Sequence, residues 1–172
     1  METVNLSKAN LLNTYNKADK AKKEFLEDLY GKETFMKVVD LDSIRTIDDV
    51  IAAHEVDDDL RILLNYSGTN EVMRGAKYFA LASMIANVFN QGWVADWNND
   101  NEAKWYAWWY LNITNSDPSG FRLDYAYFDY TTSIVGSRLC LKDESTCKKV
   151  ARLFPDVYMN LLKFNHQIPN QK

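Results

Sequence analysis

Few side chains in this sequence have the types and spacing that metal binding or catalysis needs. Asp96, Asn98 and Asp100 have the spacing of the first three ligands of a calcium-binding EF-hand loop. Such a loop also needs glycine at its sixth position and glutamate at its twelfth, where this chain has Asn101 and Ala107. The spacing therefore predicts a polar turn before a strand, and no metal site.

The thiols and imidazoles do not combine into a hydrolytic or redox site. The cysteines are Cys140 and Cys147, and the histidines, His54 and His166, lie far apart in the sequence. We expect Cys140 on a strand and Cys147 in the first turn of a helix, both as reduced core residues. No phosphate-binding loop, nucleophile elbow or dinucleotide fingerprint occurs. The sequence predicts no cofactor and no enzyme. One enzymatic alternative stays open, a reaction carried by carboxylates alone: Asp96, Asp124 or Asp129.

Aromatic side chains are the most distinctive chemical feature. All five tryptophans lie between Trp93 and Trp109, and a tyrosine-rich segment, residues 121–130, follows. Exposed rings beside cations stack on nucleic-acid bases at about 1–3 kcal/mol per base, whereas buried rings fill the space between a sheet and its helices. Because the tryptophan-rich strand holds one lysine and no arginine, we favour the structural role. A ligand- or partner-binding edge is expected at six residues: Arg138, Arg122, Trp97, Trp108, Tyr125 and Tyr127.

Length and composition narrow the class of protein. The 172 residues, 47% hydrophobic and 26% charged, are typical of one folded domain with a substantial core. No segment resembles a signal peptide and no window holds the ~18 apolar residues of a membrane span, so we expect no membrane partner. The net charge of −4 gives no global attraction for nucleic acid, although residues 120–172 hold eight bases against five acids.

The first half of the chain has helical patterns. Apolar spacing predicts one amphipathic helix over residues 7–30, ended by Gly31. Thr46 and Asp57 are the expected N-caps of two short helices. Residues 70–90 are apolar on most sides and predict the central buried helix.

After residue 103 the pattern alternates, as in strands. Residues 104–114 predict a first strand, buried on both sides or nearly so. In the second strand, alternation places Tyr125 and Tyr127 on one face with Leu123, and Arg122 on the other. Residues 131–142 predict a third strand of an antiparallel meander, with a turn at 115–120 between the first two.

The final element predicted is an amphipathic helix that begins after Asp143 as N-cap and is kinked or split by Pro155. The expected fold is α+β, with N-terminal helices packed on a three-stranded antiparallel β-meander closed by a C-terminal helix. We expect a single domain over residues 1–172, in which 1–92 are mainly helical and 103–165 form the meander and the last helix.

Two segments, "FNQGWVADWNNDNEAKWYAWWYL" and "SGFRLDYAYFDYTTSIVGSRLCLKDESTCKKVARLFPDVY", carry a resemblance to a known family. They are similar to the C-terminal half of small uncharacterised proteins of Bacteroides-type bacteria and their tailed phages, with a GW..DW element, an aromatic strand and a GSRLC.K strand. The resemblance covers about residues 75–165, and the departures are Ala95 and Pro155. It implies a phage or prophage gene product and assigns no catalytic residue.

Arg138 lies within the GSRLC motif, beside Gly136, where a bulge or close backbone contact is expected. We expect its guanidinium to pair with Asp124 or Asp129 on a sheet face, and the alternative is an anion-binding arginine.

The function expected from these observations is that of a non-enzymatic phage or prophage accessory protein acting through protein contacts or self-association. Such a protein is either a virion component or a host-directed effector, located in the cytoplasm of the bacterial host or in the virion. The alternatives are single-stranded nucleic-acid binding, which we keep as a partner class, and binding of a small ligand such as a nucleotide.

Overall fold

The computed structural model has an α+β architecture and divides into two compact units, residues 1–38 and 39–172, each described by itself here. Its described residues are 7–35, 39–54, 56–111, 120–133 and 135–163. The single domain over residues 1–172 stays a prediction. Among these residues, no helix is long and apolar enough to cross a membrane.

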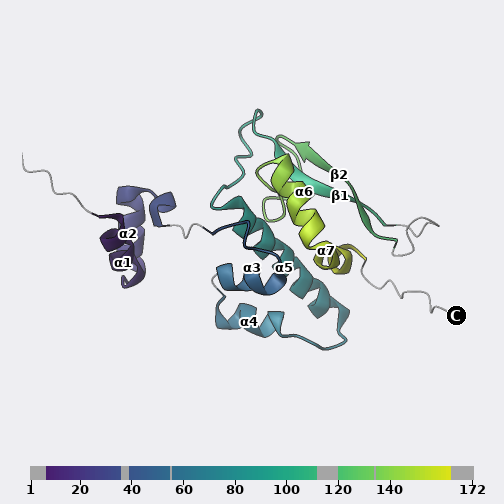
Figure 1. The fold of residues 1–172 in the computed structure, drawn as a ribbon, viewed down its shortest axis with the longest axis horizontal. Coiled ribbons are helices and arrows are strands. Elements are labelled where there is room, and N and C mark those ends of the chain that lie inside the picture. Colours follow the sequence, from purple (N-terminus) through teal and green to yellow (C-terminus); the bar gives the residue numbers. More distant parts are fainter. Residues whose placement is uncertain (1–6, 36–38, 55, 112–119, 134, 164–172) are drawn as a thin grey trace, which may run out of the picture. The chain divides into compact units, whose positions relative to one another are not determined.

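The first unit consists of α1 (Lys8–Asn16), α2 (Lys20–Tyr30) and the 3-10 helix η1 (Lys32–Phe35) (Figure 1). The prediction of one continuous helix over residues 7–30 is wrong. The Asp19 carboxylate accepts a hydrogen bond from the backbone N–H of Lys22 at 3.0 Å and so starts a second helix. Gly31, at φ 80°, ends α2 as predicted.

The second unit begins with three helices, α3 (Ile47–Ala53), α4 (Asp58–Leu64) and α5 (Glu71–Asn90). Both predicted N-caps are confirmed. The Thr46 hydroxyl accepts from the Asp49 N–H at 3.2 Å and the Asp49 carboxylate accepts from the Thr46 N–H at 2.9 Å, a reciprocal capping box. Asp57 accepts from the Leu60 N–H at 2.8 Å.

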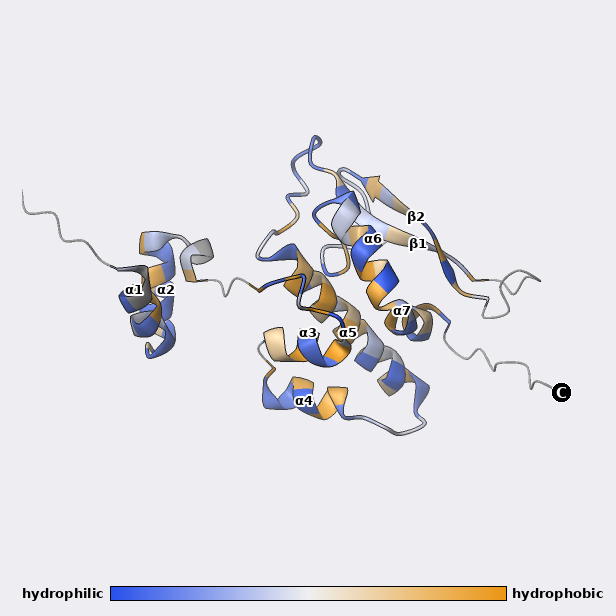
Figure 2. Cartoon of the chain, in the orientation of Figure 1, coloured by the Kyte–Doolittle hydropathy of each residue, from blue (hydrophilic) through white to orange (hydrophobic). Residues whose placement is uncertain are grey.

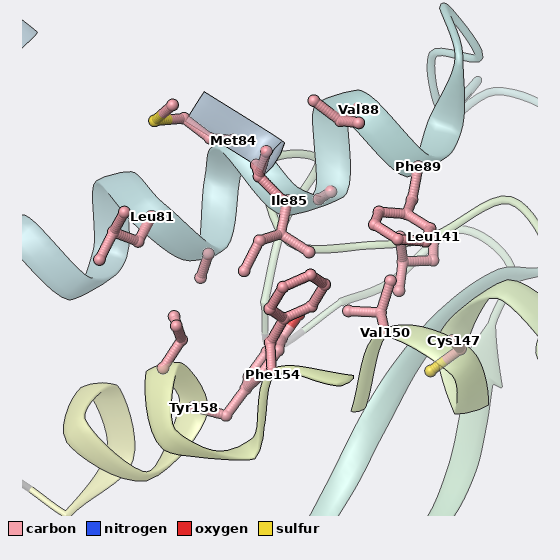
Figure 3. Packing of buried hydrophobic residues seen from close by; sticks show 14 of the residues in the cluster. Leu81, Met84, Ile85, Val88, Phe89, Leu141, Cys147, Val150, Phe154 and Tyr158 are labelled. Atoms are coloured by element: carbon pink, nitrogen blue, oxygen red, sulfur yellow. The ribbon is translucent and has the colours of Figure 1, made fainter. Parts of the chain in front are cut away.

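The C-terminal half of α5 is the centre of the core. Figure 2 shows this half as strongly hydrophobic, and Figure 3 shows its side chains meeting those of the later helices. Phe89 packs edge-to-face on Phe154, with ring centroids 6.0 Å apart. The predicted burial does not extend to the N-terminal half, where Val72 is 75% exposed. The first half of the helix is therefore only partly covered by its neighbours.

The sheet has two strands, β1 (Lys104–Tyr110) and β2 (Arg122–Asp129), which pair antiparallel. The predicted third strand is wrong. Gly136 takes a φ of 67° and its carbonyl accepts from the Leu139 N–H at 3.3 Å, so this segment curls into a turn. Among the described residues of this segment, Leu141 alone pairs with β1, through a single bridge to Trp105. The turn predicted at 115–120 falls mostly on residues 112–119, outside the described part.

Two helices close the unit, α6 (Glu144–Leu153) and α7 (Pro155–Leu162). The Asp143 carboxylate caps α6 by accepting from the Thr146 N–H at 2.7 Å, as predicted. Pro155 occupies the first turn of α7, so it splits the predicted helix in two. Helix α6 packs against both strands and against α5 (Figure 1).

Replacing the central ring tests this core. Phe89→Ala removes a fully buried ring and should lower the free energy of unfolding by about 3–5 kcal/mol. Urea denaturation of both variants measures the change. The control is Val72→Ala on the same helix, which should change it by less than about 0.5 kcal/mol because Val72 is exposed. Equal effects from the two variants would contradict the packing described.

Candidate partner-binding surface

The β1–β2 hairpin presents different chemistry on its two faces. Alternation along β1 points Trp105 and Trp109 toward the helices, where both pack against the buried core. It points Trp108 and Tyr110 the other way, and these are 41% and 39% exposed. The prediction of a strand buried on both sides is therefore wrong for its second half, because helices cover only one face.

The inner face is held by stacked rings. The Trp109 ring lies 4.6 Å from Phe121, with an interplanar angle of 16°, and 5.3 Å from Tyr158. Trp105 lies 4.6 Å from Phe128 on the paired strand. These contacts give the two inner tryptophans the structural role predicted for them.

A β-bulge decides which β2 side chains reach the other face. Trp108 pairs with Tyr125 and Trp109 pairs with Leu123, so Asp124 is an extra residue in β2. Beyond the bulge the alternation is reversed. Arg122 consequently lies on the same face as Tyr125, whereas strict alternation predicted the opposite face.

We call the side of the hairpin that points away from the helices the outer face; it carries Tyr106, which is buried, and the exposed side chains of Trp108, Tyr110, Arg122, Tyr125 and Tyr127. The Trp108 and Tyr125 rings are nearly parallel, at 15°, with centroids 6.3 Å apart. Tyr127 lies 6.1 Å from Trp108 and 6.0 Å from Tyr125. The Arg122 guanidinium lies 4.0 Å from the centroid of the Tyr110 ring, a cation–π contact. The outer face thus carries a group of neighbouring aromatic rings with the exposed Arg122 among them.

One end of the hairpin is closed by a buried lysine. Lys104 is fully buried, and its Nζ donates to the Asn99 carbonyl at 3.0 Å and lies 3.3 Å from the Glu102 carboxylate. Glu102 in turn accepts from the Trp93 Nε1 at 3.3 Å and from the Asp96 N–H at 2.8 Å. A buried ammonium needs such partners, so this group, the Lys104 cluster, holds loop 93–102 against the end of β1.

Two predicted site residues lie outside the outer face. Trp97 belongs to the Lys104 cluster, since its ring lies 5.5 Å from the Lys104 Nζ and its Nε1 donates to the Ser137 hydroxyl. Arg138 is exposed in the turn that replaces the third strand. Within the described ranges it makes no ion pair with Asp124 or Asp129, so the pairing expected for it is wrong.

Asp129 instead organises the end of β2. Its carboxylate accepts from the Thr132 hydroxyl at 2.6 Å and from the Tyr130 N–H at 2.9 Å. These two hydrogen bonds hold the pKa of Asp129 below its usual value, and the bond from Thr132 contributes more to this lowering than the bond from Tyr130. Burial raises the pKa of Tyr106, and the neighbouring Asp129 charge adds to that rise.

The structure therefore joins four of the six predicted residues, Arg122, Trp108, Tyr125 and Tyr127, on one surface. Tyr106 and Tyr110 complete it and were not predicted as site residues. In "KWYAWWY" both tyrosines stand an even number of residues from Trp108, and this spacing indicates that they share its face of the strand. No comparable pattern in the sequence indicates the burial of Lys104, because that burial depends on a loop folding over it.

Neither thiol is an activated nucleophile. Burial raises the pKa of Cys147 to about 12, and the nearby Glu144 and Asp143 carboxylates add to the rise. Burial also raises the pKa of Cys140, which lies in the segment after the turn and not on the predicted strand. In the part of the chain that the structure describes, no group of three metal-ligating side chains is close enough to hold a metal ion.

Comparison of the chain with known protein families, with curated proteins and with solved structures finds no match.

The Lys104 cluster can be tested by removing its charge. Lys104→Met keeps most of the volume but leaves the Glu102 carboxylate and the Asn99 carbonyl without this donor, so we expect a loss of about 1–3 kcal/mol in unfolding free energy. Lys148→Met is the control, because its pair with Glu144 is solvent-exposed and is worth about 0.5 kcal/mol or less. Urea denaturation measures both. A Lys104→Met variant as stable as the control would contradict the cluster.

The thiols offer a second test. In the folded protein at pH 8, Cys140 and Cys147 should react with a disulfide reagent far more slowly than free cysteine, because both are buried and protonated. Unfolding exposes both thiols and returns their pKa to the usual value. Both should therefore react fully in about 8 M urea, which is enough to unfold a small domain. Rapid reaction of either thiol in the native state would refute its burial.

Proposed function

We propose that this chain is a non-enzymatic protein that binds a protein partner through the outer face of the β1–β2 hairpin. The observation that carries the proposal is the exposure of Trp108, Tyr125 and Tyr127, at 41%, 45% and 45%, as neighbouring rings on one surface. The phage or prophage context implied by the resemblance is part of the proposal, with the protein as a virion component or a host-directed effector.

Large aromatic side chains suit this role for a physical reason. Tyrosine and tryptophan bury a wide contact area while fixing only two side-chain torsions, which keeps the entropy lost on binding small. On the outer face the rings are already in contact with one another, and the inner face of the same strands is anchored to the core. The surface is therefore preorganised, which favours affinity.

The charge of the outer face favours a protein over single-stranded nucleic acid. Proteins that bind single strands combine stacking rings with a cationic groove along the backbone. Here Arg122 is the exposed cation among the described residues of the two strands, since Lys104 is buried, and the acids Asp124 and Asp129 lie on the same strand as Arg122. A small ligand requires a concave site that encloses most of its surface, whereas these rings are open to solvent.

Single substitutions on the outer face test the proposal. The full chain serves as bait in an extract of its bacterial host, and crosslinking with mass spectrometry identifies the partner. Binding of that purified partner is then measured by calorimetry. Trp108→Ala and Tyr125→Ala should each weaken binding by about tenfold or more, as expected for central interface rings. The control is Phe79→Ala, an equally exposed ring on α5, which should leave the affinity unchanged.

The competing class is tested on the same variants. Titration with single-stranded oligothymidylate at two salt concentrations should show no binding at physiological ionic strength. Binding that weakens steeply with salt and is lost in Trp108→Ala would overturn the proposal in favour of nucleic-acid recognition.

A further inference from the structure

The hydrogen-bonding pattern of the hairpin shows which backbone groups point out of the sheet. Trp105 exchanges both backbone hydrogen bonds with Leu141, at 2.9 and 2.7 Å, so its polar groups point away from β2. In an antiparallel pair this orientation alternates along the strand. The backbone groups of Tyr106 therefore bond those of Tyr127 in β2. The backbone groups of Ala107 point away from β2, and those of Trp108 bond Tyr125.

The same alternation leaves one edge of β2 open. Because Tyr125 and Tyr127 direct their backbone groups to β1, Ala126 and Phe128 direct theirs to the opposite side. No described residue forms a backbone hydrogen bond with Ala126 or Phe128 on that side. In Figure 1, no other strand lies beside β2 on its side away from β1. Such an edge is a template for a further strand.

We propose that a second copy of this chain occupies the edge, with the two β2 strands antiparallel about a two-fold axis at Ala126. The backbone groups of Ala126 then bond those of Ala126 in the second copy, as an isologous interface requires. The two hairpins join into one four-stranded sheet. On the outer face, Tyr125 of each copy lies opposite Tyr127 of the other, which extends the aromatic surface across both copies.

Charge complementarity selects this occupant and this register. Counting across the bulge at Asp124, Arg122 of one copy falls opposite Asp129 of the other, and symmetry repeats the pair. Both side chains are on the outer face, since Arg122 pairs with Tyr110 and Asp129 with Lys104 in the hairpin. Opposite charges facing across strands stabilise the pairing. A parallel pairing of the same two edges would need a two-fold axis along the strands, which turns one hairpin over and places its Arg122 and Asp129 on the other side of the sheet.

Registers centred on a neighbouring residue of β2 also keep each side chain on its own face, and the one centred on Tyr127 is an example. It would place Asp129 opposite Tyr125 and lose both ion pairs. Pairing of the β2 edges does not depend on whether the outer face binds another protein. The inference therefore goes beyond the proposed function, and either one can be refuted without the other.

The mass of the full chain in solution tests the pairing. A contact of one strand per copy is small and predicts a weak dimer, with a dissociation constant on the order of 1–100 µM. Sedimentation from micromolar concentrations to about 1 mM should show the mass rise from 20.0 kDa toward twice that value. A monomer throughout this range would overturn the proposal.

Charge reversal identifies the interface. Arg122→Asp sets two acids against each other at both symmetric sites, and Asp129→Arg sets two bases, so each variant alone should dimerise about tenfold or more weakly. An equimolar mixture of the two variants restores both opposite-charge pairs and should dimerise like the wild type. Arg74→Asp makes the same charge change on exposed α5 and should leave dimerisation unchanged.

Rescue in the mixture cannot arise from misfolded chains, so it separates loss of the interface from loss of the fold. Dimers that persist in both single variants, or a mixture that stays monomeric, would overturn this pairing. Amide hydrogen exchange of the wild type provides a readout without any substitution. Protection of the Ala126 and Phe128 amides should increase with protein concentration, and protection independent of concentration would contradict the paired edge.

Discussion

The β1–β2 hairpin packs against helices on one of its two faces only, and the rest of this structure follows from that constraint. A two-stranded hairpin is at best marginally stable alone and must pack against other elements. The hairpin does so through Trp109, whose ring stacks with Phe121 and with Tyr158 of α7. Helices α5, α6 and α7 lie on this inner side. Trp108 and Tyr110, on the other face of β1, have no such cover, so they remain at the surface.

The end of the hairpin obeys a different constraint, the desolvation of a charge. The ammonium of Lys104 is fully buried and needs both the Asn99 carbonyl and the Glu102 carboxylate. Loop 93–102 must therefore stay closed over β1 for the lysine to remain satisfied. Trp97 is part of that closed arrangement, which is why the aromatic-rich segment divides into a structural cluster and an exposed surface.

Local signals in the sequence predicted local structure well. Thr46 and Pro155 mark helix boundaries because capping and the missing proline N–H act within a few residues. The third strand could not be excluded from alternation alone, since the turn depends on the positive φ of Gly136. The bulge at Asp124 depends on pairing with the other strand, and it alone brings Arg122 to the outer face. Four of the predicted site residues do lie on one surface. Which side chains share that surface could be known only from the pairing register of β1 and β2.

Fluorine NMR can measure how the tryptophans divide between the two faces of the hairpin. With 5-fluorotryptophan incorporated and each signal assigned by single Trp→Phe substitution, a soluble paramagnetic agent reports the access of solvent to each indole. We expect strong relaxation enhancement for Trp108, whose ring is exposed, and weak enhancement for Trp109, whose ring is packed against the core. Equal enhancement of the two signals, or a stronger effect on Trp109, would contradict this division.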